Sequence, residues 1–211
     1  MYVPRQFRED RTDTLARAVR SIQLAALVTP GPDGLQVSHV PMVLHEDAAG
    51  AWTLQTHVAR PNPHWSLAGA ASVAIFQGPQ AYVSPSFYPG KAEHGKVVPT
   101  WNYITVQARG TLRAIDDPTW VRGLVTRLTE RHEAPRPKPW ALSDAPDDYI
   151  ATMLRAIVGI EIELTALTGK WKVSQNRSAA DRHGVAEGLR EQAAGQSDSA
   201  AAAMAGWVDR S

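Results

Sequence analysis

Short runs of alternating apolar and polar residues follow one another along most of the chain, and turn residues interrupt them about every 8–12 residues. Gly, Pro and Asp mark these interruptions, as in the turn at residues 30–34, which predicts a hairpin. This spacing is typical of an antiparallel sheet closed into a barrel, and it argues against a parallel α/β sheet. The expected strands are residues 24–29, 35–43, 51–58, 72–76, 81–84, 100–115, 157–164 and 171–174.

Helical spacing of apolar residues replaces this alternation in four segments. Asp117 followed by Pro118 is a typical helix start, and Ser178 is a second candidate cap. Beyond residue 191 the chain is rich in Ala, Gly, Ser and Gln, so we expect one domain over residues 1–190 and a flexible tail over 191–211. The expected helices are residues 12–22, 118–133, 147–156 and 178–190.

Composition narrows the function classes. The 22 basic and 21 acidic residues of the 211-residue chain give a net charge of +1, so the chain as a whole has no strong field toward nucleic acid. The absence of cysteine excludes disulfides, cysteine nucleophiles and zinc–thiolate sites. No apolar run has the length of a membrane span, and residues 1–11 lack the apolar segment of a secretory signal. We therefore expect a cytoplasmic protein without a membrane partner.

Sequence motifs for several common sites are missing. No GxGxxG follows a strand and there is no GxxxxGK[ST], which argues against Rossmann and P-loop nucleotide sites. No GxSxG elbow is present for serine hydrolysis. His57 and His64 are separated by two prolines and have no carboxylate near them in sequence, so we expect no metal site.

Candidate binding residues instead gather in four polar stretches. In one of them, Arg60 offers a planar guanidinium for phosphate or carboxylate, and Asn62 before Pro63 is a typical start of a short helix. Another combines lysines with five consecutive hydrogen-bonding side chains, which suit a phosphate and the edge of a polar ring. Both stretches also fit a plain turn or a helix cap. The four stretches are residues 38–41, 57–65, 98–103 and 170–178.

A collinear set of motifs makes the chain resemble the PaiB family, the FMN-binding negative transcriptional regulators. The resemblance covers residues 1 to about 190, and Phe87 is a small departure where tryptophan is expected. It implies a mainly β (α+β) fold, an antiparallel Greek-key split β-barrel of the FMN-binding type with peripheral helices. It further implies a homodimer with FMN at the subunit interface. The motifs are Met1-Tyr-Val-Pro4, residues 57–65, 76–86, 98–103 and 169–178, and Asp181-Arg182 with Gly184-Val185.

The resemblance, together with the chemistry of the residues, gives a set of expected cofactor contacts. Arg60, Lys172, Arg177 and Ser178 suit the phosphate. The backbone of residues 38–40, or the amides of Gln175 and Asn176, suits the edge of the flavin ring. Trp101 or Trp65 suits the face of that ring. No catalytic residue is assigned. The expected cofactor-binding residues are Ser38, His39, Val40, His57, Arg60, Asn62, Trp101, Lys172, Gln175, Asn176, Arg177 and Ser178.

Three functions stay open within this fold. The first is negative transcriptional regulation with DNA as a partner. The helix at 118–133 carries three arginines and a histidine, yet it lacks a convincing helix-turn-helix partner, so these residues are expected to form a solvated face. The second is a flavin-dependent oxidoreductase, either NAD(P)H:flavin or pyridoxamine-phosphate-oxidase-like. The third is a non-catalytic flavin- or haem-binding protein, because a fold does not fix a function.

Overall fold

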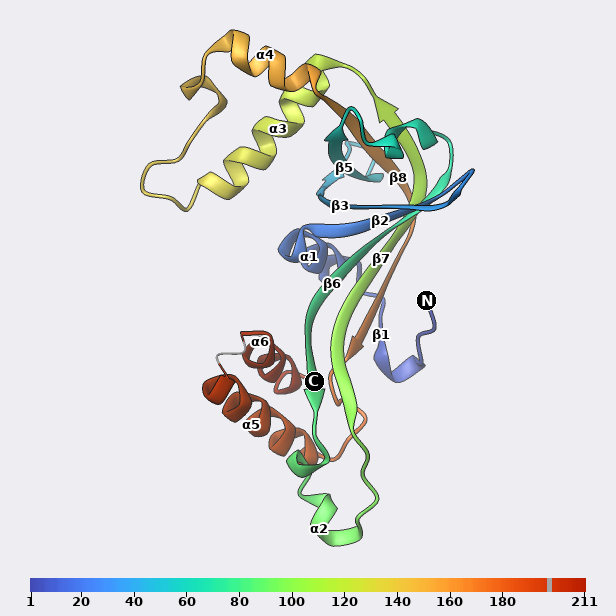
Figure 1. The fold of residues 1–211 in the computed structure, drawn as a ribbon. Helices are drawn as coiled ribbons and strands as arrows, with labels where there is room; N and C mark the ends of the chain where they lie inside the picture. Colours follow the sequence, from blue (N-terminus) through green and yellow to red (C-terminus); the bar gives the residue numbers. More distant parts are fainter. Residues whose placement is uncertain (197–198) are drawn as a thin grey trace. The chain divides into compact units, whose positions relative to one another are not determined.

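The computed structural model of the chain describes residues 1–196 and 199–211, and it contains an eight-stranded sheet with flanking helices (Figure 1). The strand order is β3-β2-β6-β7-β8-β5-β4, with β1 also paired to β8. The path ends at β3 and β4, so the hydrogen-bonded sheet of the described residues is open and the expected closure into a ring is wrong. The strands are β1 (Arg8–Glu9), β2 (Leu24–Gly31), β3 (Gly34–Pro41), β4 (Val43–Glu46), β5 (Trp52–Ala59), β6 (Ala71–Val83), β7 (Thr100–Ile115) and β8 (Ile157–Lys172).

Helices lie mainly at the ends of the long strands and in the second half of the chain. The α-helices are α1 (Thr12–Ile22), α2 (Gly90–His94), α3 (Pro118–Glu133), α4 (Asp147–Arg155), α5 (Ala179–Gln196) and α6 (Ser199–Val208). Short 3-10 turns are η1 (Arg5–Phe7), η2 (Pro63–Leu67), η3 (Pro85–Phe87) and η4 (Leu142–Asp144). No helix of the described residues is long and apolar enough to cross a membrane.

The chain forms two compact units, which are described separately. Unit 1 comprises Met1–Ala18, Gln77–Gln107 and Thr168–Ser211, and unit 2 comprises Val19–Phe76 and Ala108–Leu167. Strands β6, β7 and β8 each contribute residues to both units. The single domain expected over residues 1–190 therefore contains parts of two contact units.

The predicted hairpin of unit 2 is confirmed, with one change at its end. Strands β2 and β3 pair antiparallel from Leu24 opposite Pro41 to Gly31 opposite Gly34. The expected return strand does not run on to Val43, because the N–H of Met42 bonds the carbonyl of Gln23 and ends the ladder. A separate strand, β4, then pairs with β5.

Two predicted turns are wrong, since β6 and β8 each run through them as single strands. A Cβ at Gly78 would lie 3.3 Å from Cβ of Ile104 on β7, so this glycine permits close strand approach. A Cβ at Gly169 would lie 2.4 Å from both the Trp171 ring and Leu15. Both glycines keep negative or extended φ, so they meet a packing requirement and do not form turns.

Helices α3 and α4 of unit 2 lie side by side (Figure 1) around a small apolar cluster. Asp117 caps α3 as predicted, accepting a hydrogen bond from the Thr119 N–H at 2.8 Å, with Pro118 in the first turn. Trp120 packs against Gly159 of β8, where a Cβ would be 2.4 Å from the indole. The cluster consists of Val121, Leu142, Ile150 and Leu154.

The end of the chain is helical where a flexible tail was expected. Helix α5 continues to Gln196 and α6 packs against it (Figure 1), while residues 197–198 of the expected tail lie outside the described residues. Met204 is fully buried, and Trp207 meets the Trp171 ring edge-on at 6.2 Å between centroids. Alanine favours helix and a few large apolar residues anchor it, so an Ala-rich composition supports a packed helix here.

Candidate functional site

A tight turn in unit 1, residues 173–178, connects β8 to α5. Ser174 has a φ of 68°, in the left-handed region, and its side chain is buried. Asn102 of β7 donates its amide Nδ2 to Ser174 Oγ at 2.9 Å. This buried polar contact holds the turn against β7. The cationic side chains of this region therefore have fixed positions relative to that strand.

Lys172 lies at the start of this turn and is held by β7. Its Nζ donates to the Trp101 carbonyl oxygen at 2.9 Å and also to Thr100 Oγ1. Partial burial lowers the pKa of Lys172, and the positive charges of Lys170 and Arg177 lower it further. The ammonium therefore sits in a locally positive environment that disfavours its own charge, which is the electrostatic condition under which an anion binds well.

The other two cations are fixed by aromatic rings. The Arg177 guanidinium carbon lies 4.9 Å from the centroid of the Tyr88 ring, and Lys170 Nζ lies 5.2 Å from that of Tyr103. Among the described residues, neither these two cations nor Lys172 forms an ion pair with a carboxylate. We call Lys170, Lys172 and Arg177 the cation cluster. Its charge is uncompensated by any described acid within ion-pair distance.

Trp101, whose carbonyl accepts the hydrogen bond from Lys172, also belongs to an exposed pair of aromatic rings. Trp101 is 54% exposed and Tyr82 is 40% exposed, and their rings meet edge-on with centroids 5.9 Å apart. Large aromatic side chains are usually buried, so two exposed rings next to fixed cations stand out from an ordinary surface. This arrangement can hold a planar ring and an anionic group together.

The remaining expected residues of the turn have local partners. Gln175 accepts a hydrogen bond from the Val173 N–H at 2.9 Å and donates to the Trp171 carbonyl, so both ends of its amide are used. Ser178 Oγ accepts from the Asp181 N–H at 3.1 Å and caps α5. Asn176 is exposed. The interpretation of this stretch as a helix cap is confirmed. Its cationic side chains are the groups best placed to contact a ligand.

In unit 2, the polar loop after β5 closes on a buried histidine. His64 is fully buried, with Nδ1 2.9 Å from Ser38 Oγ and Nε2 2.8 Å from Thr29 Oγ1. Asn62 caps η2 as predicted by accepting the His64 N–H at 3.0 Å, and its Nδ2 donates to Ser38 Oγ at 3.1 Å. Ser38 and His64 have the separation of a nucleophile and its base, but both side chains are buried.

The other β3 candidates differ in exposure. Val40 is buried like Ser38, whereas His39 points to the exposed side. Strand β3 is an end strand of the sheet, so half of its backbone N–H and C=O groups face away from β2. Backbone groups of β3, and not the Ser38 hydroxyl, are therefore the atoms open to a ligand.

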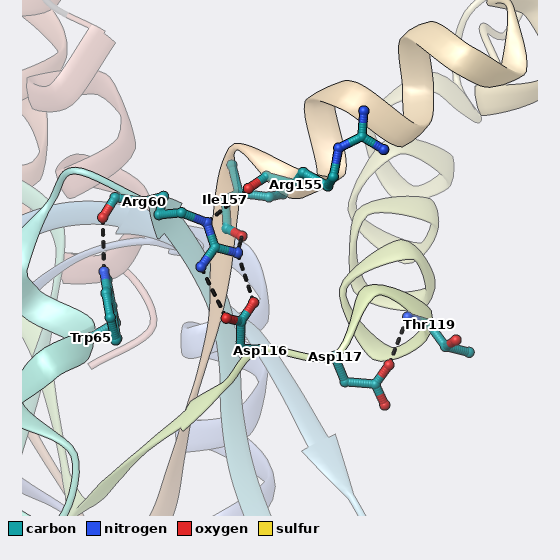
Figure 2. A network of polar contacts seen from close by, with 7 residues as sticks. All are labelled: Arg60, Trp65, Asp116, Asp117, Thr119, Arg155 and Ile157. Carbon is teal, nitrogen blue, oxygen red and sulfur yellow. Dashed lines mark hydrogen bonds and ion pairs between the residues drawn. The ribbon is translucent and has the colours of Figure 1, made fainter.

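Arg60 is occupied within unit 2 (Figure 2). Its guanidinium donates to both carboxylate oxygens of Asp116, at 2.9 and 2.7 Å, and to the carbonyls of Arg155 and Ile157. Its own carbonyl accepts the Trp65 indole N–H at 2.9 Å. The hydrogen bond from Arg60 lowers the pKa of Asp116. A phosphate at Arg60 would have to displace this carboxylate.

His57 faces a separate hollow of about 390 Å³ between β5 and α3. Burial lowers its pKa, and its buried Nδ1 has no hydrogen-bond partner in the described part of the chain. The hollow is lined by Pro41, His57, Val125, Leu128, Thr129, His132, Glu133 and Trp140.

The structure thus sorts the twelve expected residues into two sets. Unit 1 holds Trp101, Lys172, Gln175, Asn176, Arg177 and Ser178, and unit 2 holds Ser38, His39, Val40, His57, Arg60 and Asn62. The expected contact residues omitted Lys170 and His64, although both lie within the polar stretches, and they omitted Tyr82, which lies in none of the four. The polar stretch at residues 57–65 contained the signal for His64, but no local pattern indicates that Tyr82 meets Trp101.

Comparison with known proteins now identifies the family. Residues 1–166 match the family model described as "Putative FMN-binding domain". An uncharacterised protein of Aspergillus fumigatus is 32% identical, over 90% of this chain and 91% of its own length. The "Protease synthase and sporulation protein PAI 2" of Bacillus subtilis is 27% identical, over 91% of this chain and 90% of its own.

Solved structures show the same fold at low identity. The flavocytochrome Anf3 of Azotobacter vinelandii has a TM-score of 0.56 at 12% identity, covering 81% of this chain and 72% of that one. The FAD and haem binding protein of Mycobacterium smegmatis has a TM-score of 0.53 at 15% identity, covering 78% and 73%. The expected α+β fold of the flavin-binding split-barrel type is confirmed. The chain therefore belongs to the "Putative FMN-binding domain" family, the PaiB-type group that its motifs resemble.

Proposed function

We propose that the protein binds FMN and that Lys172 and Arg177 hold its phosphate. The observation that carries this proposal is the cation cluster without an acidic partner beside the exposed Trp101. A phosphate dianion is best held by fixed cations, and a flavin ring stacks on an exposed indole. The family assignment supports the same cofactor.

In unit 2, we propose that the outward backbone of β3 at residues 38–40 meets the hydrogen-bonding edge of the flavin. An end strand offers alternating N–H and C=O groups, which suit a ring edge with both acceptors and donors. When bound, FMN supplies redox chemistry, while the protein's residues bind and orient it. Arg60 and Gln175 have weaker support as cofactor contacts, because their polar atoms already have protein partners.

A homodimer is the proposed assembly. On β3, the side chains of Leu35 and Val37 are exposed on one face of an end strand. Burying such side chains against a second copy stabilises an assembly by about 25 cal/mol per Å². Sedimentation equilibrium tests this proposal: a species of twice the chain mass supports it, and a monomer at micromolar concentration contradicts it.

The first proposed role is negative transcriptional regulation of the PaiB type. The name of the Bacillus subtilis relative, which refers to protease synthesis and sporulation, supports a role of this kind. DNA binding that weakens steeply with salt would be its signature. Binding that is absent at low salt would contradict it.

A flavin-dependent oxidoreductase is the second proposed role, and one observation favours it. On α3, Arg127 donates to Gln55 at 2.7 Å and Arg131 donates to the Arg20 carbonyl, so two of the helix's arginines are engaged with the protein itself. Fewer cations are then free for DNA phosphates. Bleaching of bound FMN by NAD(P)H under anaerobic conditions tests this role, and an unchanged flavin spectrum would contradict it.

A further inference from the structure

The buried network around His64 contains an unusually complete hydrogen-bond chain. It runs from Ser38 Oγ to His64 Nδ1, from Nε2 to Thr29 Oγ1, and from Thr29 Oγ1 to Ser72 Oγ at 2.7 Å. Ser72 Oγ then contacts the Ala70 carbonyl oxygen at 3.3 Å. A carbonyl only accepts, so the direction of every proton in the chain follows from this end.

Working backward gives one assignment. Ser72 donates to Ala70, Thr29 must then donate to Ser72, and Nε2–H must donate to Thr29. His64 Nδ1 is left as the acceptor of the Ser38 hydroxyl proton, while Ser38 Oγ accepts from Asn62. Every hydrogen in the chain then has an acceptor, and His64 is neutral.

The other states of His64 break this chain. With the proton on Nδ1, Thr29 must turn toward Nε2 and Ser72 toward Thr29. The bond to Ala70 is then lost, and the Ser38 proton has no acceptor among the described contacts. A doubly protonated ring leaves the same Ser38 proton unpartnered and places a positive charge in a fully buried site. Burial separately lowers the pKa of His64.

We propose that His64, as the neutral Nε2–H tautomer, is a positioning residue that fixes Ser38 and thereby the outward backbone of β3 for the hydrogen-bonding edge of a flavin. This proposal rests on the proposed function in unit 2. Its chemical basis is that Ser38 is held from two directions: its main chain pairs with β2, and its hydroxyl accepts from Asn62 and donates its only proton to His64. Supporting groups of this kind set the precision of a binding site.

Nitrogen-15 NMR of the histidine rings in the full-length protein tests the tautomer without any ligand. The expected result is a neutral Nε2–H ring for His64 at pH 7 that titrates at a lower pH than a free histidine, whose pKa is about 6.5. A Nδ1–H tautomer or a doubly protonated ring at pH 7 would overturn the assignment.

The variant Thr29→Val tests positioning, because it removes the acceptor of Nε2–H and keeps the side-chain shape. The matched control is Thr53→Val on β5, whose buried hydroxyl has no hydrogen-bond partner among the described residues. We expect Thr29→Val to shift the His64 tautomer and to weaken FMN binding about threefold to tenfold, the size of one hydrogen bond, while Thr53→Val changes neither.

The outcomes separate the two proposals. If Thr29→Val shifts the tautomer and leaves FMN affinity unchanged, positioning by His64 is refuted and FMN binding stands. If the wild-type protein binds no FMN, the proposed function fails, and the positioning role fails with it, while the NMR result still decides the proton assignment. Should Thr29→Val not fold, Ser72→Ala provides the second variant, since it removes only the far end of the chain and should release the tautomer preference in part.

Discussion

Replacing Lys172 by Gln should weaken FMN binding about tenfold and leave the fold intact. The ammonium has three N–H donors, and two of them already bond Trp101 O and Thr100 Oγ1, so one remains for a phosphate oxygen. A charge-assisted hydrogen bond contributes about 1.5–3 kcal/mol. Lys172 is only partly buried, so the lower end, about 1.5 kcal/mol, applies, and this corresponds to about a tenfold change in Kd.

The pKa of Lys172 gives the expected pH dependence. Burial, followed by Lys170 and Arg177, lowers this pKa in the free protein. A bound phosphate favours the charged ammonium, so binding raises the pKa back and takes up protons at alkaline pH. FMN affinity should therefore fall as the pH rises from the depressed pKa toward 10.5, the ordinary value, and this fall should be absent in Lys172→Gln.

The same shift predicts that Lys172→Gln does not destabilise the free protein at pH 7. Because the folded pKa lies below the unfolded one, the charged lysine costs stability at every pH below the folded pKa, and the cost disappears above the unfolded pKa. A neutral glutamine avoids this cost. Equal or higher Tm together with weaker FMN binding would distinguish a binding residue from a structural one.

The assay is quenching of FMN fluorescence at constant ionic strength, repeated with riboflavin, which lacks the phosphate. Lys172→Gln should weaken FMN binding and leave riboflavin binding unchanged. Lys91→Gln, an exposed lysine of α2 in the same unit, is the matched control and should change neither. Equal FMN affinity in wild type and Lys172→Gln, or an equal loss for both flavins, would refute the phosphate role of Lys172.

Further predictions concern stability and the alternative phosphate residue. Gly110→Ala should destabilise the fold by about 3 kcal/mol or more in urea unfolding, because the new Cβ would lie 2.0 Å from the Glu163 carbonyl oxygen, and an unchanged midpoint would contradict this packing. Arg60→Ala should lower Tm slightly and leave FMN affinity unchanged, because Arg60 already binds Asp116. A large loss of affinity would instead indicate that Arg60 contacts the phosphate. Met204→Ala in α6 should lower the free energy of unfolding by about 2–5 kcal/mol, because Met204 is fully buried. Unchanged stability would support the flexible tail expected from the sequence. His64→Gln should reduce the loss of stability on acidification, since the depressed pKa of His64 gives stability that is complete above about pH 6.5 and is lost as the pH falls through the folded pKa.

The local sequence pattern predicted those helices and strands whose ends are determined by nearby residues and not by distant contacts. Helix α3 begins at the Asp117-Pro118 pair because capping is decided within a few residues. The turns expected at Gly78 and Gly169 failed because these glycines serve close packing against Ile104 of β7 and Leu15 of α1, which lie far from them in the sequence. Strand pairing over a long distance replaced the local preference there.

For the candidate site, the sequence predicted which side chains are suited to binding better than it predicted what each side chain contacts. Lys172 and Arg177 were expected for a phosphate and lie in the cation cluster. Arg60 has the same chemistry, yet Asp116, more than fifty residues later in the chain, occupies it. The ring pair of Trp101 and Tyr82 depends on the register of two strands, which single-sequence patterns do not contain.

The most direct test of the central claim is an equilibrium titration of the purified, dialysed protein with FMN, followed by absorbance and by fluorescence quenching. The account predicts saturable binding of one FMN per chain, tighter than riboflavin because the cation cluster holds the phosphate. No binding at micromolar FMN would contradict it, and the assignments of Lys172, Arg177 and Trp101 would then have to be withdrawn.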